Sequence, residues 1–184
     1  MNKYCVADVQ AALKYLETRY AISRFVLVGW SFSGAPVFTL GGSDKRVVAC
    51  AAVASQTAGA DGIGRMAPKP VLLIHGTGDR RLRHSCSRQL FELYGRRGER
   101  ELKLFEGDGH SLRKNAGKVG KMLCAFVMRF AGVEERRVVR RKLVRDDDSV
   151  YLMKKGGELK EKGKSVVNHG RRCSAKLLDP IAAG

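Results

Sequence analysis

The sequence lacks several features that would place it in particular classes of protein. It has no apolar run long enough for a transmembrane helix, and its N-terminus lacks the charged-then-apolar pattern of a secretion signal. Its five cysteines are odd in number and scattered, with no C-x-x-C pair, so neither a disulfide framework nor a zinc site is indicated. We therefore expect a cytoplasmic protein without a membrane segment, and no pattern in the chain indicates a metal or a cofactor.

Acidic residues are scarce beside basic ones, since 18 Asp and Glu against 35 Lys and Arg give a net charge of +17. The excess is spread over the chain: residues 1–133 hold 21 basic and 10 acidic side chains, and residues 134–184 hold 14 and 8. No basic stripe is interleaved with aromatic residues, so we expect a generally basic surface and no specific nucleic-acid site. Weak, salt-sensitive binding to anions is expected.

The chain of 184 residues, 44% of them hydrophobic, is long enough for one domain with a real core. Short apolar or alternating runs predict strands, and amphipathic stretches predict helices between them. The predicted strands are 24–29, 47–54, 70–75 and 101–105, and the predicted helices are 5–20, 34–40, 85–94 and 118–130. This alternation indicates an α/β fold with a mostly parallel sheet of about four strands and flanking helices. The polar–apolar alternation in 101–105 favours a sheet edge for that strand.

One stretch, Phe25–Gly34, joins a predicted strand to a predicted helix through a sharp turn. A serine on such a turn has its hydroxyl exposed above the sheet, provided that the residues two before and two after it are small. Gly29 and Ser33 meet this requirement around Ser31, which is therefore the predicted nucleophile. Ser33 has small residues at the same spacing and is ranked second.

An acid and a histidine follow two later predicted strands. Asp79 ends the glycine-rich turn after strand 70–75, and His110 comes shortly after strand 101–105. Because ligands bind beyond the carboxyl ends of parallel strands, we expect both residues at the same edge of the sheet as Ser31. A serine needs a histidine to take its proton and an acid to orient that histidine. The sequence thus predicts a Ser31–Asp79–His110 triad, with Asp108 as the alternative acid.

The other histidines have simpler interpretations. We assign His75, at the end of strand 70–75, a structural role, and we place His84 and His169 on the surface. Trp30 is expected to pack beside the pocket.

The chain order Ser31, Asp79, His110 resembles that of the α/β-hydrolases. Their nucleophile elbow reads G-x-S-x-G, whereas here the fifth position is Ser33 and the glycine follows it. Three motifs resemble those of the dienelactone-hydrolase-like and prolyl-oligopeptidase-like esterase branches: Gly29–Gly34, His75–Asp79 and Gly107–His110. Dienelactone hydrolases proper use a cysteine nucleophile, and the serine here departs from them.

The resemblance covers residues 5–133 and implies a serine hydrolase that acts on small-molecule carboxylic esters or related acyl substrates. It implies that the backbone N–H of Phe32 is one oxyanion donor. It also implies that residues 1–133 are the C-terminal half of the fold, with the second oxyanion donor on an upstream segment. Residues 134–184 are predicted to be a basic, mostly disordered tail, because their charge content is too high for a core.

The alternative is a truncated, catalytically inactive hydrolase fragment that acts at most as a binding module. If the strand at 24–29 normally pairs with an upstream strand, its apolar backbone would be an open edge in this chain. We therefore expect self-association through residues 24–29.

Overall fold

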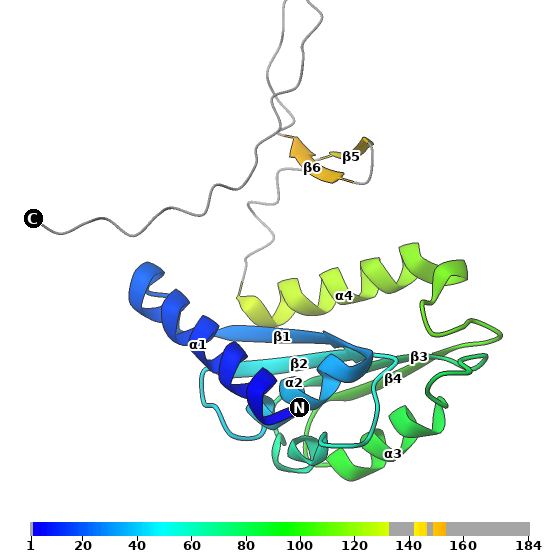
Figure 1. Ribbon diagram of the computed structural model, residues 1–184, viewed down its shortest axis with the longest axis horizontal. Coiled ribbons are helices and arrows are strands. Elements are labelled where there is room, and N and C mark those ends of the chain that lie inside the picture. The colour runs from blue at the N-terminus through cyan, green and yellow to red at the C-terminus, as the bar shows by residue number, and fades with distance from the viewer. Residues whose placement is uncertain (1, 133–141, 147–148, 154–184) are drawn as a thin grey trace, which may run out of the picture. The chain divides into compact units, whose positions relative to one another are not determined.

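The computed structural model describes residues 2–132, 142–146 and 149–153. The chain divides into two units, Met1–Arg137 and Val138–Gly184, which are described separately. In the first unit helices alternate with strands (Figure 1). Its elements are α1 (Asn2–Tyr20), β1 (Phe25–Trp30), η1 (Ser31–Ser33), α2 (Gly34–Gly41), β2 (Val47–Val53), η2 (Asp61–Arg65), β3 (Val71–Gly76), α3 (Ser85–Tyr94), β4 (Arg100–Phe105), η3 (Arg113–Asn115) and α4 (Ala116–Ala131). Within the described ranges, no helix is both long and apolar enough to cross a bilayer.

The four strands of the first unit form one parallel sheet in the order β1-β2-β3-β4. Because sequential strands are neighbours and run in the same direction, their carboxyl ends lie along one edge of the sheet. The turns that follow Trp30, Gly76 and Phe105 therefore open on the same side. This arrangement confirms the predicted parallel sheet of about four strands with flanking helices, and it confirms that β4 lies at an edge.

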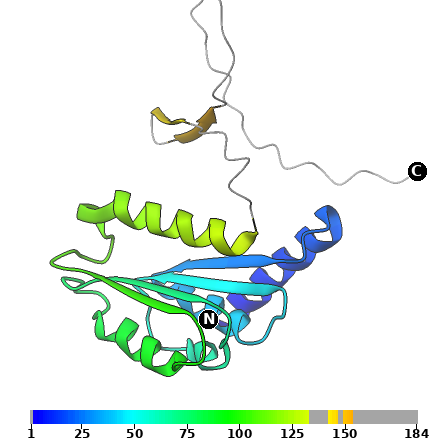
Figure 2. The same cartoon turned by 180° about the vertical axis from the view of Figure 1, so that it is seen from behind.

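Side chains of the central strands alternate between two hydrophobic cores. In β3, Val71 and Leu73 belong to the core shared with α1, α2 and α3, whereas Leu72 and Ile74 belong to the core shared with α4. Figures 1 and 2 show α4 on one side of the sheet and the other three helices on the opposite side. Because both faces are covered, β2 and β3 are continuous apolar runs without the alternation of a half-exposed strand.

The two edges of the sheet differ in charge. The edge strand β4 carries Arg100, Glu101 and Lys103, which discourage pairing with another strand. β1 has no charged residue, and no other strand in the described ranges pairs with its free side. Its Val28 and Trp30 side chains are 45% and 41% exposed. Such an edge favours strand pairing, and the expected self-association through residues 24–29 stays a prediction.

The second unit contains a two-stranded antiparallel hairpin of β5 (Lys142–Asp146) and β6 (Ser149–Met153). The sequence predicts a mostly disordered tail, and that prediction stays open beside this short hairpin. Both strands carry β-branched and apolar residues, which favour strand formation. The remainder of the predicted tail lies outside the described residues.

Candidate active site

Ser31 begins the 3₁₀ turn η1, immediately after β1. Its φ of +56° lies in the left-handed region, which residues with a side chain adopt rarely and at an energetic cost. Close backbone approaches hold the turn: a Cβ on Gly29 would lie 2.6 Å from the backbone oxygen of Ser33, and a Cβ on Gly34 would overlap the hydroxyl of Ser55. Ser33 is tolerated at the fifth position because the close contact with Ser55 falls on Gly34, one residue later.

His110 bridges Ser31 and Asp79. Its Nε2 lies 3.0 Å from Ser31 Oγ, and its Nδ1 lies 2.6 Å from Asp79 Oδ2. Because an ionised carboxylate only accepts hydrogen bonds, Nδ1 carries the proton and donates it to Asp79. Nε2 is then free to accept the hydrogen bond that the Ser31 hydroxyl donates. The Asp79 side chain is fully buried, whereas the His110 side chain is 16% exposed, so the series runs from the interior toward solvent.

The two oxygens of Asp79 have separate partners. Oδ1 accepts hydrogen bonds from the backbone N–H groups of Arg81 and Leu82, at 2.8 and 3.0 Å, and Oδ2 accepts from His110. Burial would raise the pKa of this carboxyl, but the hydrogen bonds from Leu82, His110 and Arg81 outweigh it and hold the pKa below its ordinary value. Asp79 thus stays ionised at neutral pH while it fixes both the turn and the imidazole.

His75 is a neighbour of the site whose contacts the sequence analysis missed. It is fully buried, and its Nε2 lies 3.2 Å from Asp79 Oδ2 and 3.0 Å from the Leu82 carbonyl oxygen. Both of these groups only accept, so Nε2 carries the proton, and Nδ1 accepts from the Ser87 hydroxyl at 2.7 Å. Burial lowers the pKa of His75, and the Leu82 carbonyl and Asp79 offset part of this effect. The one sequence signal for this contact is a histidine four residues before the acid at a strand end.

Asp108, the alternative acid, holds a loop and makes no described hydrogen bond to His110. Its Oδ1 accepts from the backbone N–H of Gly109 at 3.0 Å, and its Oδ2 accepts from the backbone and side-chain N–H groups of Asn115 at 3.1 and 3.0 Å. Burial would raise the pKa of this carboxyl, but these hydrogen bonds hold it below its ordinary value. His110 therefore binds Asp79, whereas Asp108 binds backbone and side-chain groups of the loop that carries His110.

The second-ranked serine faces another environment. Ser33 lines a mainly apolar cavity of about 390 Å³ between α1 and β1, and within the described ranges it makes no hydrogen bond to a histidine. Phe32, the predicted oxyanion donor, follows Ser31 directly in the turn, and its role stays a prediction. His84 is half-buried just before α3, and His169 lies outside the described residues.

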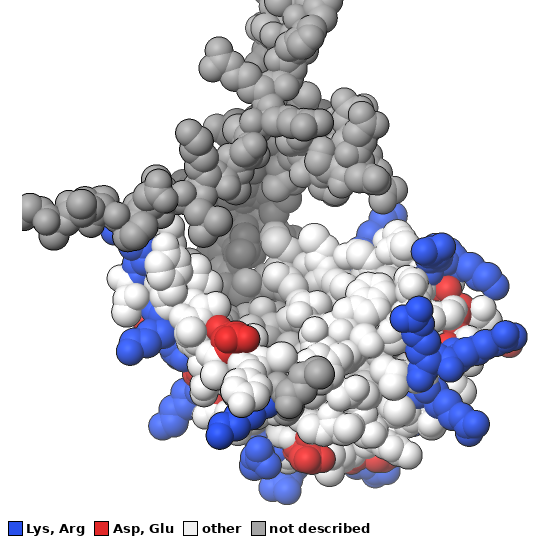
Figure 3. Space-filling view, viewed as in Figure 1, with Lys and Arg blue, Asp and Glu red and all other residues white. Residues whose placement is uncertain are grey.

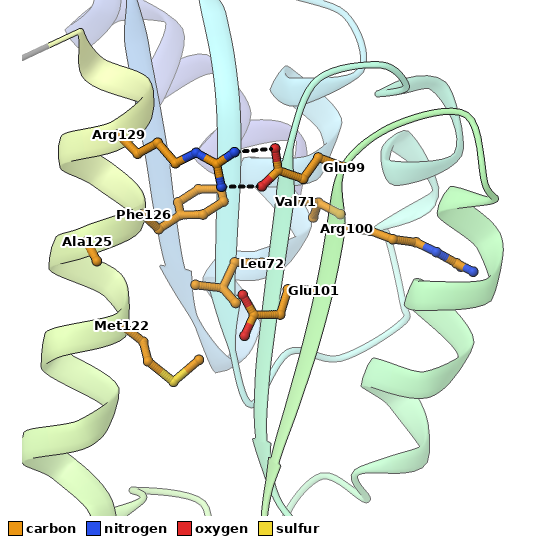
Figure 4. Close-up of a pocket in the computed structure, with 9 residues that line it drawn as sticks. All are labelled: Val71, Leu72, Glu99, Arg100, Glu101, Met122, Ala125, Phe126 and Arg129. Atoms are coloured by element: carbon orange, nitrogen blue, oxygen red, sulfur yellow. Dashed lines mark hydrogen bonds and ion pairs between the residues drawn. The ribbon is translucent and has the colours of Figure 1, made fainter.

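Two further cavities lie at opposite ends of the sheet. One of about 260 Å³ is lined by residues 108–114 and so includes His110. A larger one of about 400 Å³ lies between α4 and the amino ends of β3 and β4, where Arg129 pairs with Glu99 at 2.6 Å (Figure 4). This larger cavity contains none of the three predicted triad residues. Across the described residues, no group of three His, Cys, Asp or Glu side chains is arranged to hold a metal ion.

No protein-family model matches this chain, and no curated protein matches its sequence. Solved structures do match. The esterase domain of a Rhodothermus marinus protein matches with a TM-score of 0.59 and 19% identity, over 69% of this chain and 70% of that chain. The fold is that of the α/β-hydrolases. Est1E from Butyrivibrio proteoclasticus matches with a TM-score of 0.59 and 13% identity over 68% and 69%, and an α/β serine hydrolase homologue from Coxiella burnetii with 0.58 and 19% over 66% and 58%.

In this α/β-hydrolase fold the three triad candidates come from turns that follow different strands. Ser31 follows β1, Asp79 follows β3 and His110 follows β4. The serine and the histidine that it contacts are 79 positions apart in the sequence. The parallel sheet brings them together because all three turns leave its carboxyl edge. The arrangement can pass a proton from a serine hydroxyl to an imidazole that is held by a buried carboxylate.

Proposed function

We propose that this protein is a serine hydrolase that cleaves carboxylic esters or related acyl compounds through Ser31, His110 and Asp79. The observation that carries the proposal is the hydrogen-bonded series from Ser31 Oγ to His110 (3.0 Å) and from His110 to Asp79 (2.6 Å). The names of the solved neighbours, which include an esterase domain and a serine hydrolase homologue, support the same class of reaction. The motifs around the three residues also lead us to propose the dienelactone-hydrolase-like esterase branch.

In the first half of the proposed reaction, His110 Nε2 takes the proton of the Ser31 hydroxyl as Oγ attacks the acyl carbon. The carbonyl oxygen gains a negative charge, which the backbone N–H of Phe32 stabilises. His110 then gives its proton to the leaving alcohol, and Ser31 remains as an acyl ester. Asp79 stabilises the imidazolium and keeps its Nδ1–H in place throughout.

In the second half, a water molecule replaces the alcohol. His110 takes a proton from the water as its oxygen attacks the acyl carbon of the Ser31 ester, and the proton then returns to Ser31 Oγ as the acid leaves. The strained turn holds Oγ above the sheet for both steps. His75 acts only through Asp79, because its N–H contacts that carboxylate and no other member of the series.

The test is labelling with a neutral fluorophosphonate, which reacts with an activated serine and requires no knowledge of the substrate. We expect the chain to be labelled at Ser31, and we expect Ser31→Ala and His110→Ala to abolish labelling. Ser33→Ala is the matched control and should still be labelled, and Asp108→Ala should react through an intact Asp79. Labelling that survives Ser31→Ala but is lost in Ser33→Ala would contradict the assignment of the nucleophile.

The second candidate is an inactive hydrolase fragment that serves as a binding module. The observation that favours it is that we assign one oxyanion donor, Phe32, and find no second donor to assign within the described ranges. Loss of one such donor costs about 2.7–4 kcal/mol of transition-state stabilisation in measured cases. A folded chain in which Ser31 does not react with the fluorophosphonate would support this candidate.

A further inference from the structure

The open edge of the sheet at β1 is free of charge. β1 pairs with β2 on one side, and within the described ranges no strand covers its other side. Residues 25–43 contain no charged side chain, although the whole chain has a net charge of +17. Lys and Arg side chains lie around the margins of the face in Figure 3, whereas its middle, across which β1 runs in Figure 1, is largely uncharged. Two copies of this basic chain can therefore approach each other along β1 with little repulsion.

The backbone of β1 presents a regular set of hydrogen-bonding groups to the open side. The Phe25 N–H donates to the Arg46 carbonyl oxygen at 2.8 Å, so the peptide groups of Phe25 face β2. Because successive residues of a strand direct their N–H and C=O groups to opposite sides, those of Val26, Val28 and Trp30 face away from β2. The Val28 and Trp30 side chains are also 45% and 41% exposed. The set of outward-facing residues is centred on Val28.

A mainly apolar cavity of about 390 Å³ lies beside this edge, between α1 and β1. Its lining includes Leu27 of β1, Phe32 just after β1 and Val9 of α1, and its one acid is Asp8. Asp8 is exposed and forms no ion pair in the described part of the chain. The same holds for Arg24, which directly precedes β1. One end of the open edge thus has an unpaired base, and the other end has an unpaired acid.

We propose that this surface binds a second copy of the same chain, with the two β1 strands antiparallel and Val28 on the two-fold axis. A two-fold axis perpendicular to a sheet makes identical edge strands antiparallel and places one residue opposite itself. With Val28 on the axis, Val26 lies opposite Trp30 of the second copy, and all the outward-facing backbone groups form hydrogen bonds. Two four-stranded sheets then become one sheet of eight strands. This inference does not depend on the proposed hydrolase function.

The side chains match in the same register. Directly opposite residues of an antiparallel pair project to the same face, so Val28 meets Val28, and Val26 meets Trp30 of the second copy. Pairs of β-branched and aromatic side chains stabilise a sheet, and these pairs cover the exposed side chains of the edge. On the other face Leu27 of the second copy lies opposite Gly29, which has no side chain, and projects toward the cavity beside it.

The antiparallel orientation also brings opposite charges together. In this register Arg24 of the second copy lies opposite Phe32, and Phe32 lines the same cavity as Asp8. The Arg24 guanidinium of one copy is therefore within reach of the Asp8 carboxylate of the other, and the two-fold axis repeats the pair. A parallel arrangement would instead place the two Arg24 side chains beside each other. Charge complementarity thus favours an antiparallel second copy.

Cysteine cross-linking tests the register. Val28→Cys places two thiols on the axis, and the Cα atoms of a hydrogen-bonded antiparallel pair are about 5.5 Å apart, which suits a disulfide. Val26→Cys is the matched control on the same strand and face, because its two thiols would lie roughly 14 Å apart along the paired strands. After mild oxidation, peptide mapping should find chains joined through position 28 at least tenfold more often than through position 26. Equal cross-linking at the two positions would overturn the proposed register.

A proline substitution separates the interface from the fold. Val28→Pro removes an N–H that faces the second copy and leaves the ladder with β2 in place, as edge strands tolerate. In sedimentation velocity the full chain should form a dimer, and Val28→Pro should be a monomer with an unchanged circular dichroism spectrum. A full chain that is monomeric at all concentrations, or a folded Val28→Pro chain that dimerises as tightly as the parent, would overturn the proposal.

Charge reversal tests the orientation. Asp8→Lys and Arg24→Glu each create two like-charged pairs in the dimer and should each weaken dimerisation on the order of tenfold at low salt. Mixing the two variants should restore it, because the mixed dimer again contains two pairs of opposite charge. A mixture that associates no more tightly than either variant alone would overturn the antiparallel arrangement.

Discussion

Replacing His75 with leucine removes a buried histidine whose only contact with the three triad candidates is its hydrogen bond to Asp79. The imidazole donates from Nε2 to Asp79 Oδ2 at 3.2 Å and to the Leu82 carbonyl at 3.0 Å, and it accepts from the Ser87 hydroxyl at 2.7 Å. Leucine has a similar bulk but makes none of these bonds. We therefore expect a loss of stability together with a loss of reactivity at Ser31.

The size of the loss follows from the three contacts. A hydrogen bond to an ionised carboxylate contributes about 1.5–3 kcal/mol, and a buried polar group left without a partner costs about 1–3 kcal/mol. The Ser87 side chain is fully buried, so its hydroxyl bears this cost, whereas the Leu82 carbonyl is partly exposed and bears less of it. The free energy of unfolding should fall by about 3–5 kcal/mol, a large share of the 5–15 kcal/mol of a typical domain.

Urea unfolding at neutral pH measures the loss, and fluorophosphonate labelling measures the reactivity of Ser31. We expect the labelling rate of folded His75→Leu to fall about ten- to a hundredfold. Without the His75 N–H, Oδ2 of Asp79 is less firmly placed for its hydrogen bond to His110. His75→Gln keeps an N–H near the position of Nε2 and should restore part of both quantities. His84→Leu is the control, because the His84 side chain is half-buried and makes no described hydrogen bond. A His75→Leu chain that is no less stable than the His84→Leu control would refute this reasoning.

The other predictions concern pH, the turn, the sheet edge and the tail. Burial lowers the pKa of His75 below its ordinary 6.5, so protonation favours the unfolded chain. The contribution of His75 to the free energy of unfolding should be fully present above pH 6.5 and should decrease as the pH falls below 6.5. Thermal melts of His75→Gln should lack this decrease. Gly34→Ala should destabilise the protein by about 1–3 kcal/mol in urea unfolding, because its Cβ overlaps the side chain of Ser55, and added Ser55→Gly should relieve part of the loss. The chain should self-associate through β1 in sedimentation velocity. Val28→Lys should weaken this association, whereas a lysine placed on β4 should not. A chain that is monomeric at all concentrations would contradict this expectation. Limited proteolysis should remove residues 134–184 and spare the chain before them, and a resistant tail would count against the predicted disorder.

The sequence by itself determined the type and order of the elements in the first unit. The run at 47–54 predicts a buried strand and β2 spans Val47–Val53; the amphipathic stretch at 118–130 predicts a helix and α4 spans Ala116–Ala131. These predictions succeed because the periodicity of apolar residues is a local property that burial on one or two faces imposes. The hairpin of β5 and β6 was not predicted, because the high charge of residues 134–184 outweighed two short apolar runs in the interpretation of the tail.

The sequence also determined where along the chain the candidate site lies. Ser31, Asp79 and His110 each follow a predicted strand, and a parallel sheet brings such positions to one edge whatever the details of packing. The sequence therefore predicts that the three residues lie near one another. It also predicts their pairing as a triad, but it leaves Ser33 and Asp108 as alternatives.

Only the tertiary structure decided which side chains meet. Ser31 and Ser33 are two residues apart with similar neighbours, and the left-handed φ of +56° at Ser31, with the close packing at Gly29, turns the first toward His110. Asp79 presents Oδ2 to His110 while the backbone N–H groups of Arg81 and Leu82 hold its Oδ1. Side-chain direction depends on such backbone angles and on contacts between residues far apart in the chain, and neither leaves a periodic trace in the sequence. The sequence assigned His75 a structural role but did not show its contact with Asp79, because that contact also depends on side-chain direction.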